Sequence, residues 1–251
     1  MALCAEVETL EITLRRPDDW HHHLRDGADV LRDTVRAASA QFSRAIVMPN
    51  LVPPVTTAAM AAEYKARITA ALASNGAAPG SFTPLMTMYL TDSTTPEEIR
   101  AAAAAGDVKA VKLYPAGATT NSDSGVTDYA KVQAALVTMA EVGMPLCVHG
   151  EVTDPSVDIF DRERVFIKTK LPQLLLLAPG LKIVLEHLST KEAVEAVLAE
   201  GSTIGGTLTP QHLLVSRRSG RAIPFLHSQR QAPAPRAGRL GMRNTFQPIG
   251  L

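Results

Sequence analysis

The stretch PEEIRAAAAAGDVKAVKLY (residues 96–114) contains the repeating pattern that decides the fold class. Its first part, residues 96–105, is rich in alanine and favours a helix, whereas residues 108–114 form a short apolar run typical of a buried strand. A helix-forming segment next to a buried strand is the repeating unit of parallel α/β proteins. The stretch therefore predicts an α/β architecture if the unit recurs.

The unit recurs on both sides of this stretch. Further strands are predicted at residues 21–25, with 10–15 leading into them, and at residues 45–48, 83–90, 145–149, 182–187 and 202–208. Further helices are predicted at residues 30–40, 57–74, 129–142 and 191–200, and the section 160–177 is largely helical. This order predicts a parallel α/β sheet or barrel with seven strands, whereas a closed barrel needs eight.

The composition narrows the class of protein further. With 251 residues, 46% of them hydrophobic, the chain can bury a sizeable core within one domain. Its 25 basic and 25 acidic residues balance, so no global charge indicates nucleic acid or an anionic membrane. Two cysteines cannot form a disulfide framework, and no apolar run is long enough to span a bilayer. Because the N-terminus lacks the features of a signal or transit peptide, we predict a cytoplasmic protein. The alternative location is an organelle, if a transit peptide is missing from this form of the chain.

The run Trp20–Asp26, WHHHLRD, is the strongest sign of chemistry in the chain. Side chains alternate faces along a strand, so His21, His23 and Arg25 are predicted to point the same way. Two neutral imidazoles so placed are half of a transition-metal site, and an arginine beside them could hold a carboxylate. The alternative is that three consecutive histidines are a surface accident or the remnant of a tag.

Four more polar residues lie where the other strands end: Asn50, Lys112, His149 and His187. Each alone has an ordinary structural explanation, but parallel α/β barrels place their chemistry at the carboxyl ends of the strands. If Val111 and Leu113 pack outward on the helices, Lys112 points inward; Cys147 shares the parity of His149 and is read as an interior packing residue. Four histidines and a lysine facing inward predict a two-metal hydrolytic site. Zinc suits these ligands, and cobalt or manganese could replace it.

Five segments resemble the successive motifs of dihydroorotases, a family of the amidohydrolase superfamily, in its bacterial and plant monofunctional branch. They are RPDDWHHHLRDG (16–27), AIVMPNLVPPVTT (45–57), KLYPAGATTNS (112–122), MPLCVHGE (144–151) and EHLST (186–190). The resemblance runs from about residue 10 to about residue 215. It implies a TIM-barrel-like (β/α)8 metal-dependent hydrolase that reversibly cyclises N-carbamoyl-L-aspartate to dihydroorotate in pyrimidine biosynthesis.

The resemblance also implies a role for each matched residue. His21 and His23 would bind one zinc ion, His149 and His187 the other, and a carboxylated Lys112 would bridge the two. Arg25, Asn50 and His149 would contact the substrate, and Thr119 and Thr120 would lie on a mobile loop that closes over it. Two departures are small: His22 replaces an apolar residue, and Gly117 stands where asparagine is common.

A third departure concerns catalysis. The family's eighth strand ends in Gly-Thr-Asp-Ser-Ala-Pro-His, whose aspartate is a metal ligand and the general acid/base, and no such block follows here. From Gly201 onward the chain has no Asp or Glu. We therefore expect an incomplete barrel over residues 1–215, lacking the eighth strand, a divergent basic Pro/Arg/Gln-rich tail over 216–251, and little or no catalytic activity, with the catalytic acid/base unknown.

Three alternatives stay open. The chain could be a non-catalytic form that binds metal or a full-length partner. It could be a hydantoinase-like enzyme, although Arg25 and Asn50 suit a carboxylate that simple hydantoins lack. The basic tail could bind nucleic acid, although it has no interleaved aromatic residues. The resemblance also implies a homodimer, and neither nucleic acid nor a membrane is expected as a partner.

Overall fold

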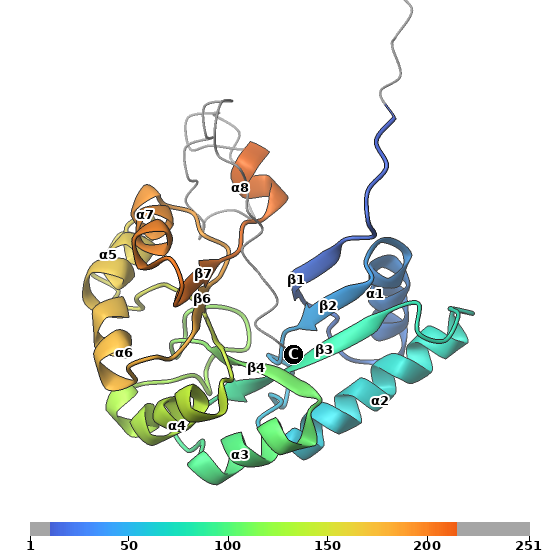
Figure 1. Ribbon diagram of the computed structural model, residues 1–251, viewed down its shortest axis with the longest axis horizontal. Helices are drawn as coiled ribbons and strands as arrows, with labels where there is room; N and C mark the ends of the chain where they lie inside the picture. Colours follow the sequence, from blue (N-terminus) through green and yellow to red (C-terminus); the bar gives the residue numbers. More distant parts are fainter. Residues whose placement is uncertain (1–10, 215–251) are drawn as a thin grey trace, which may run out of the picture.

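The computed structural model describes residues 11–214, which form a single curled sheet flanked by helices (Figure 1). All seven strands are parallel and neighbours in the sheet are neighbours in sequence. They are β1 (Asp18–His22), β2 (Arg44–Val47), β3 (Thr83–Leu90), β4 (Val108–Leu113), β5 (Leu146–Val148), β6 (Ile183–Leu185) and β7 (Ile204–Gly206). The predicted parallel α/β fold is confirmed as a seven-stranded half-barrel. The predicted tail, 216–251, lies outside the described residues.

The helices lie around the outside of the curled sheet (Figure 1). They are α1 (Ala28–Gln41), α2 (Ala58–Ser74), α3 (Pro96–Ala105), α4 (Tyr129–Val142), α5 (Arg162–Thr169), α6 (Leu171–Leu177), α7 (Lys191–Glu200) and α8 (Pro210–Leu214). Every predicted helix is confirmed, and α3, α4 and α7 have the predicted bounds; α8 was not predicted. Within residues 11–214 no helix is long and apolar enough to cross a membrane.

Local signals explain why the bounds of α3 were predictable. The Thr95 side chain accepts a hydrogen bond from the amide of Glu98, and Pro96 occupies the first turn, where its missing N–H costs nothing. Gly106 ends the helix with a φ of 75°, a left-handed conformation that glycine adopts without steric cost.

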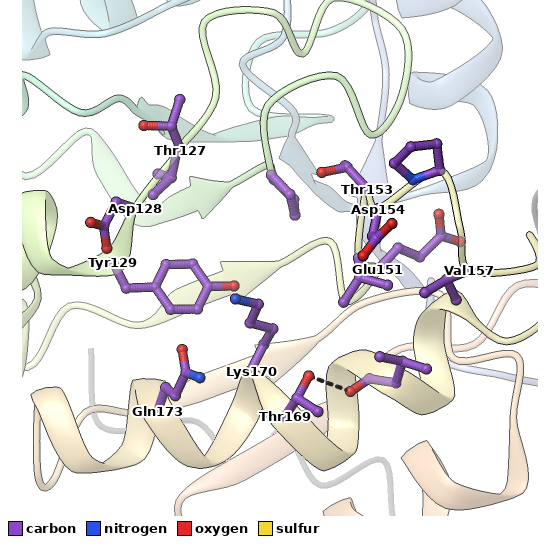
Figure 2. Close-up of a pocket in the computed structure, with 15 residues that line it drawn as sticks. Thr127, Asp128, Tyr129, Glu151, Thr153, Asp154, Val157, Thr169, Lys170 and Gln173 are labelled. Carbon is purple, nitrogen blue, oxygen red and sulfur yellow. Dashed lines mark hydrogen bonds between the residues drawn. The ribbon is translucent and has the colours of Figure 1, made fainter.

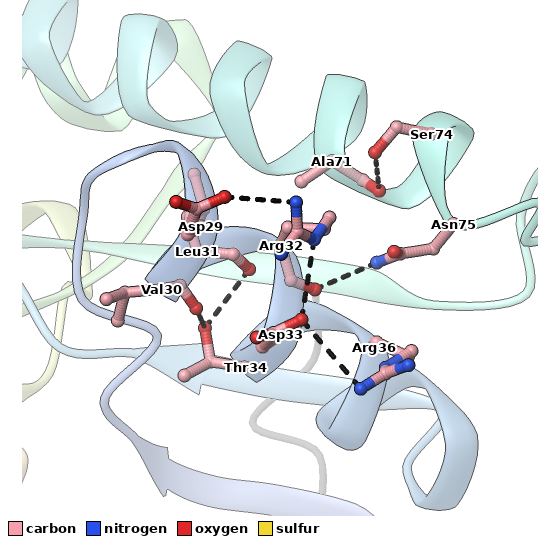
Figure 3. A network of polar contacts seen from close by, with 10 residues as sticks. All are labelled: Asp29, Val30, Leu31, Arg32, Asp33, Thr34, Arg36, Ala71, Ser74 and Asn75. Atoms are coloured by element: carbon pink, nitrogen blue, oxygen red, sulfur yellow. Dashed lines mark hydrogen bonds and ion pairs between the residues drawn. The ribbon is translucent and has the colours of Figure 1, made fainter.

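The first two helices are joined at the surface by a polar network (Figure 3). The Arg32 guanidinium of α1 lies 3.0 Å from Asp29 and 3.4 Å from Asp33. The Asn75 side-chain amide, at the end of α2, donates to the Arg32 carbonyl at 2.9 Å. Of these contacts, only the hydrogen bond from Asn75 crosses between the two helices; the ion pairs lie within α1.

Alternation along β4 sorts its side chains as predicted. Val111 and Leu113 belong to the main core between sheet and helices, whereas Ala110 packs with Cys147 and Val184 in a separate small cluster. Lys112 has the parity of Ala110 and is fully buried. The predictions that Lys112 points inward and that Cys147 is an interior packing residue are confirmed.

The first strand differs from the prediction. β1 covers Asp18–His22 instead of 21–25, and residues 11–17 are not part of a strand. Arg25 has a φ of 63°, so it cannot continue a strand. The physical reason is the partner strand: β2 ends at Val47, opposite His22, so residues 23–25 have no strand residues beside them to continue the ladder. The alternation argument is therefore wrong for Arg25, and its placement has to come from the tertiary structure.

Candidate metal centre

All four predicted histidines meet at the carboxyl edge of the sheet. The ring centroids of His21 and His23 lie 5.0 Å apart, those of His21 and His187 5.3 Å, and those of His149 and His187 4.7 Å. They come from three segments distant in sequence: β1 and the residue after it, the end of β5, and the loop after β6. Curling of the sheet brings these strand ends together, which forms a continuous row of imidazoles.

Lys112 lies beside this row, paired with a carboxylate that was not among the predicted site residues. Its Nζ donates to Glu186 Oε2, and the same oxygen lies 2.9 Å from His21 Nδ1. Burial opposes ionisation of Glu186, but the neighbouring His21 and Lys112 outweigh it and lower the pKa of Glu186 to about 2. The signal that could have found Glu186 is the same alternation: Leu185 packs in the outer core, so the next residue faces inward.

The electrostatics keep two of the imidazoles neutral. Burial, together with the nearby His21 and Arg25, lowers the pKa of His23 to about 3. Burial and the neighbouring His149 and Lys112 lower the pKa of His187 well below its usual value. Neutral imidazole is the form that binds a metal ion, so both side chains are ready to act as ligands at pH 7.

The donor set fits transition-metal ions in chemistry and in pairwise spacing. His21 Nε2 and His23 Nε2 face each other at 3.1 Å, close to the roughly 3.3 Å that separates two nitrogens on one tetrahedral zinc. His149 Nε2 is buried and makes no hydrogen bond within residues 11–214, although Glu151 Oε2 lies 3.4 Å away. A buried nitrogen without a donor or acceptor is costly unless it has another partner.

The ligands are nevertheless grouped in pairs. Among the described residues, no three His, Cys, Asp or Glu side chains are arranged to hold one metal ion. The buried Lys112–Glu186 ion pair lies beside the histidines, and as an ammonium Lys112 is a cation that cannot ligate a metal. The four histidines thus offer two pairs of ring nitrogens, and within residues 11–214 neither pair is a complete ligand set by itself.

Arg25, which follows His23 by two residues, lines one cavity together with Asn50, and none of the four histidines borders that cavity. The cavity has a volume of about 440 Å³ and is also lined by Asp26, Gly27, Leu51, Val52 and Asn121. The Asn50 amide donates to the Thr120 carbonyl at 3.0 Å, and the Asn121 amide donates to the Asn50 carbonyl at 3.1 Å. Two hydrogen bonds therefore connect Asn50 to the loop that contains the exposed Thr119 and Thr120. Asn121, which donates one of them, was not among the predicted site residues.

A larger cavity of about 740 Å³ lies between the loops after β4 and β5 and the helices α5 and α6 (Figure 2). Tyr129, Lys170 and Gln173 line it, with the Lys170 ammonium 6.0 Å from the Tyr129 ring centroid. Glu151 borders this cavity, whereas none of the four histidines does. No sequence motif indicated this cavity.

Comparison with known proteins agrees with this architecture. No family model matches the chain. Dihydroorotases of Cereibacter sphaeroides and Ralstonia nicotianae are 57% and 58% identical to it over 209 and 213 residues, which are 83% and 85% of this chain. These alignments cover 59% and 60% of the relatives, so the chain spans about three fifths of their length.

Solved structures give the same result. The dihydroorotase of Campylobacter jejuni superposes with a TM-score of 0.71 at 33% identity, over 87% of this chain and 59% of its own. That of Saccharomyces cerevisiae, in complex with 5-fluoroorotic acid, has a TM-score of 0.74 at 29% identity, over 86% and 62%. The L-hydantoinase of Arthrobacter aurescens, at 18% identity and a TM-score of 0.58 over 80% and 48%, shares the fold alone.

The fold and the histidine row define the chain as an α/β half-barrel of the amidohydrolase type. Within that class, the proteins to which the chain is identical at more than half of the aligned residues are dihydroorotases. The hydantoinase alternative has no support beyond the shared fold.

Proposed function

We propose that this chain contains the metal- and substrate-binding part of a zinc-dependent dihydroorotase, which interconverts N-carbamoyl-L-aspartate and dihydroorotate in de novo pyrimidine biosynthesis. One observation carries the proposal: four histidines and an inward lysine converge at the strand ends, and Arg25, two residues after His23, lines a cavity together with Asn50. The identity of 57% to a dihydroorotase supports the same substrate class.

The pairs of histidines suggest which residues would hold each ion. His21 and His23 would bind one Zn²⁺ and His149 and His187 the other, with Lys112 as a carbamate between them. The carbamate forms when the neutral Lys112 amine attacks CO₂ and loses a proton, so that the side chain changes from a cation to an anion. Bound zinc supplies a Lewis acid and lowers the pKa of a coordinated water.

The remaining residues have binding roles in the proposal. The Arg25 guanidinium offers paired N–H donors that match a carboxylate, and the Asn50 amide can add a further donor. Both line the 440 Å³ cavity, a volume within the usual range for a small-molecule site. The hydrogen bonds of Asn50 with Thr120 and Asn121 would let closure of residues 119–121 respond to a bound carboxylate.

Proton transfer is the step for which the proposal assigns no residue of this chain. The resemblance assigns the general acid/base to an aspartate in a block that this sequence lacks, and such catalysis typically contributes about 10²–10⁴-fold to the rate. We therefore expect little or no turnover by this chain. In the alternative, the chain is a non-catalytic form that binds metal or a full-length partner, and a homodimer stays a prediction from the family.

The deciding experiment compares the zinc-supplemented chain with its His149→Ala variant in dihydroorotate binding, ring opening and zinc content. Binding of dihydroorotate and of two zinc ions, lost in part in the variant, supports the proposal even without turnover. A folded chain that binds neither zinc nor dihydroorotate contradicts it. Turnover abolished by His149→Ala would contradict the expected inactivity alone.

A further inference from the structure

The segment that carries Arg25 has a conformation that local sequence does not favour. Arg25 has a φ of 63°, and the next-but-one residue, Gly27, has a φ of 90°. A residue with a Cβ rarely adopts a left-handed backbone, because the Cβ crowds the following carbonyl oxygen. Contacts from outside the segment must therefore select this conformation, which directs Arg25 to the wall of the 440 Å³ cavity.

Two hydroxyl groups hold successive carbonyls of this turn. Thr34 Oγ1, on α1, donates to the Leu24 carbonyl at 2.6 Å; this residue is drawn in Figure 3. The Tyr64 hydroxyl, on α2, donates to the Arg25 carbonyl. Tyr64 is 0% exposed, and burial raises the pKa of its hydroxyl, so the group stays protonated and remains a donor.

A third contact is weaker. The Arg67 guanidinium lies 5.3 Å from the Tyr64 ring centroid and 2.9 Å from the Asp26 carboxylate. Both members of this ion pair are more than one third exposed, with side-chain accessibilities of 45% and 39%. An exposed pair contributes little, so the buried Tyr64 hydroxyl is the stronger constraint on the turn.

We propose that Tyr64 is a positioning residue for Arg25: its buried hydroxyl holds the Arg25 carbonyl and thereby aims the guanidinium into the cavity. The inference rests on the proposed function, since it gives Arg25 a substrate carboxylate to bind. Tyr64 itself does not line the cavity, and therefore acts through Arg25. The helix α2 thus takes part in substrate recognition through one hydroxyl group.

The test is a double-mutant cycle on the zinc-supplemented chain, with dihydroorotate as the probe. Tyr64→Phe keeps the buried ring and removes only the hydroxyl, and we expect it to weaken binding about five- to tenfold. In an Arg25→Ala background the same change should cause no further loss, because its effect passes through Arg25. Tyr129→Phe, which removes a hydroxyl in the separate 740 Å³ cavity, is the matched control and should bind normally.

The backbone of the turn gives a second measurement that needs no ligand. In nuclear magnetic resonance spectra, Tyr64→Phe should shift the Arg25 Cα signal away from its left-handed value and speed amide exchange at residues 25–27. Unchanged Arg25 signals, or an equal affinity loss in the Arg25→Ala background, would overturn the inference. If the wild-type chain does not bind dihydroorotate, the proposed function fails, and the Arg25 signals decide the positioning role.

Discussion

His22 and His23 are neighbours in the chain, but they have different surroundings. His23 Nε2 faces His21 Nε2 at 3.1 Å, whereas His22 Nδ1 lies 2.8 Å from the Asp19 carboxylate and its ring packs edge-on near Phe42. His23 therefore lies in the histidine row, where the proposal makes it a metal ligand, whereas the partly buried His22 pairs with Asp19 outside the row.

Substitution of each histidine by alanine tests this assignment. We expect His23→Ala to remove one zinc ion from the loaded chain, or to lower its affinity by about 100-fold or more, because a ligand of that ion is lost. His22→Ala, the matched control, should leave zinc content unchanged. Both variants are measured by titration with zinc and by metal analysis after dialysis; equal losses in the two would contradict the assignment.

Lys112 and Glu186 form a buried ion pair, in which each charge needs the other. Lys112 and Glu186 are both fully buried, and removal of one partner would leave a buried charge without compensation. Carboxylation of Lys112 would reverse its charge beside Glu186. The pairing of this residue is therefore linked directly to its chemical state.

At the scale of elements, one carboxylate joins α5 to the N-terminus of α7. Glu163 accepts hydrogen bonds from the Ser189 amide and hydroxyl at 3.1 Å and from the Thr190 hydroxyl, and Thr190 caps α7. These contacts order the loop that follows His187. Burial nevertheless dominates and raises the pKa of Glu163 to about 7.

This shift predicts how stability depends on pH. Between about pH 4.5, the usual value, and pH 7 the folded state holds a proton that the unfolded state has lost. The free energy of unfolding should therefore fall as pH rises through this window, by at most roughly 3 kcal/mol from this group. Glu163→Gln should flatten the dependence, measured by urea unfolding at pH 5 and pH 8.

The control for this prediction is Glu195→Gln on α7, where Glu195 lies 3.3 Å from Lys191 at the surface. It should keep the wild-type dependence on pH. If Glu163→Gln and the wild type have the same dependence, the buried carboxyl group does not titrate as described.

At the scale of the whole molecule, the sheet has a free edge at each end. β1 pairs only with β2, and β7 only with β6, within residues 11–214. Free edges of parallel sheets offer unpaired N–H and C=O groups to other chains. Several exposed apolar side chains lie near these edges, among them Leu14, Leu208 and Leu214.

We expect the chain to self-associate through this region as concentration rises. Leu214→Lys, at a position 82% exposed on the helix after β7, should reduce association, because a charge there resists burial. Leu176→Lys, at a position 81% exposed on α6, is the matched control and should have little effect. Sedimentation velocity at several concentrations measures both; equal effects would place the contact elsewhere.

Much of the fold was predictable, for reasons that belong to individual segments. Residues 96–105, 129–142 and 191–200 carry helix signals along their own length, and the apolar runs between them match the strands β3 to β7. The segment before β1 was not predictable, because residues 11–17 alternate in a way that suits a strand, but no strand within residues 11–214 pairs with them. For the site, the sequence indicated the four histidines, Lys112, Arg25 and Asn50, but not Glu186. The roles of these residues stay proposals.

The sequence by itself determined the parallel α/β order and which residues of β4 and β5 face inward, because backbone geometry imposes these periods within a few residues. Only the tertiary structure decided the pairing of Lys112 with Glu186, 74 residues apart, and the contact of Tyr64 with Arg25, 39 residues apart. These contacts depend on how the strands curl and where α2 packs, and no local period encodes that packing. The direction of Arg25, which lines the 440 Å³ cavity, is a property of the folded molecule.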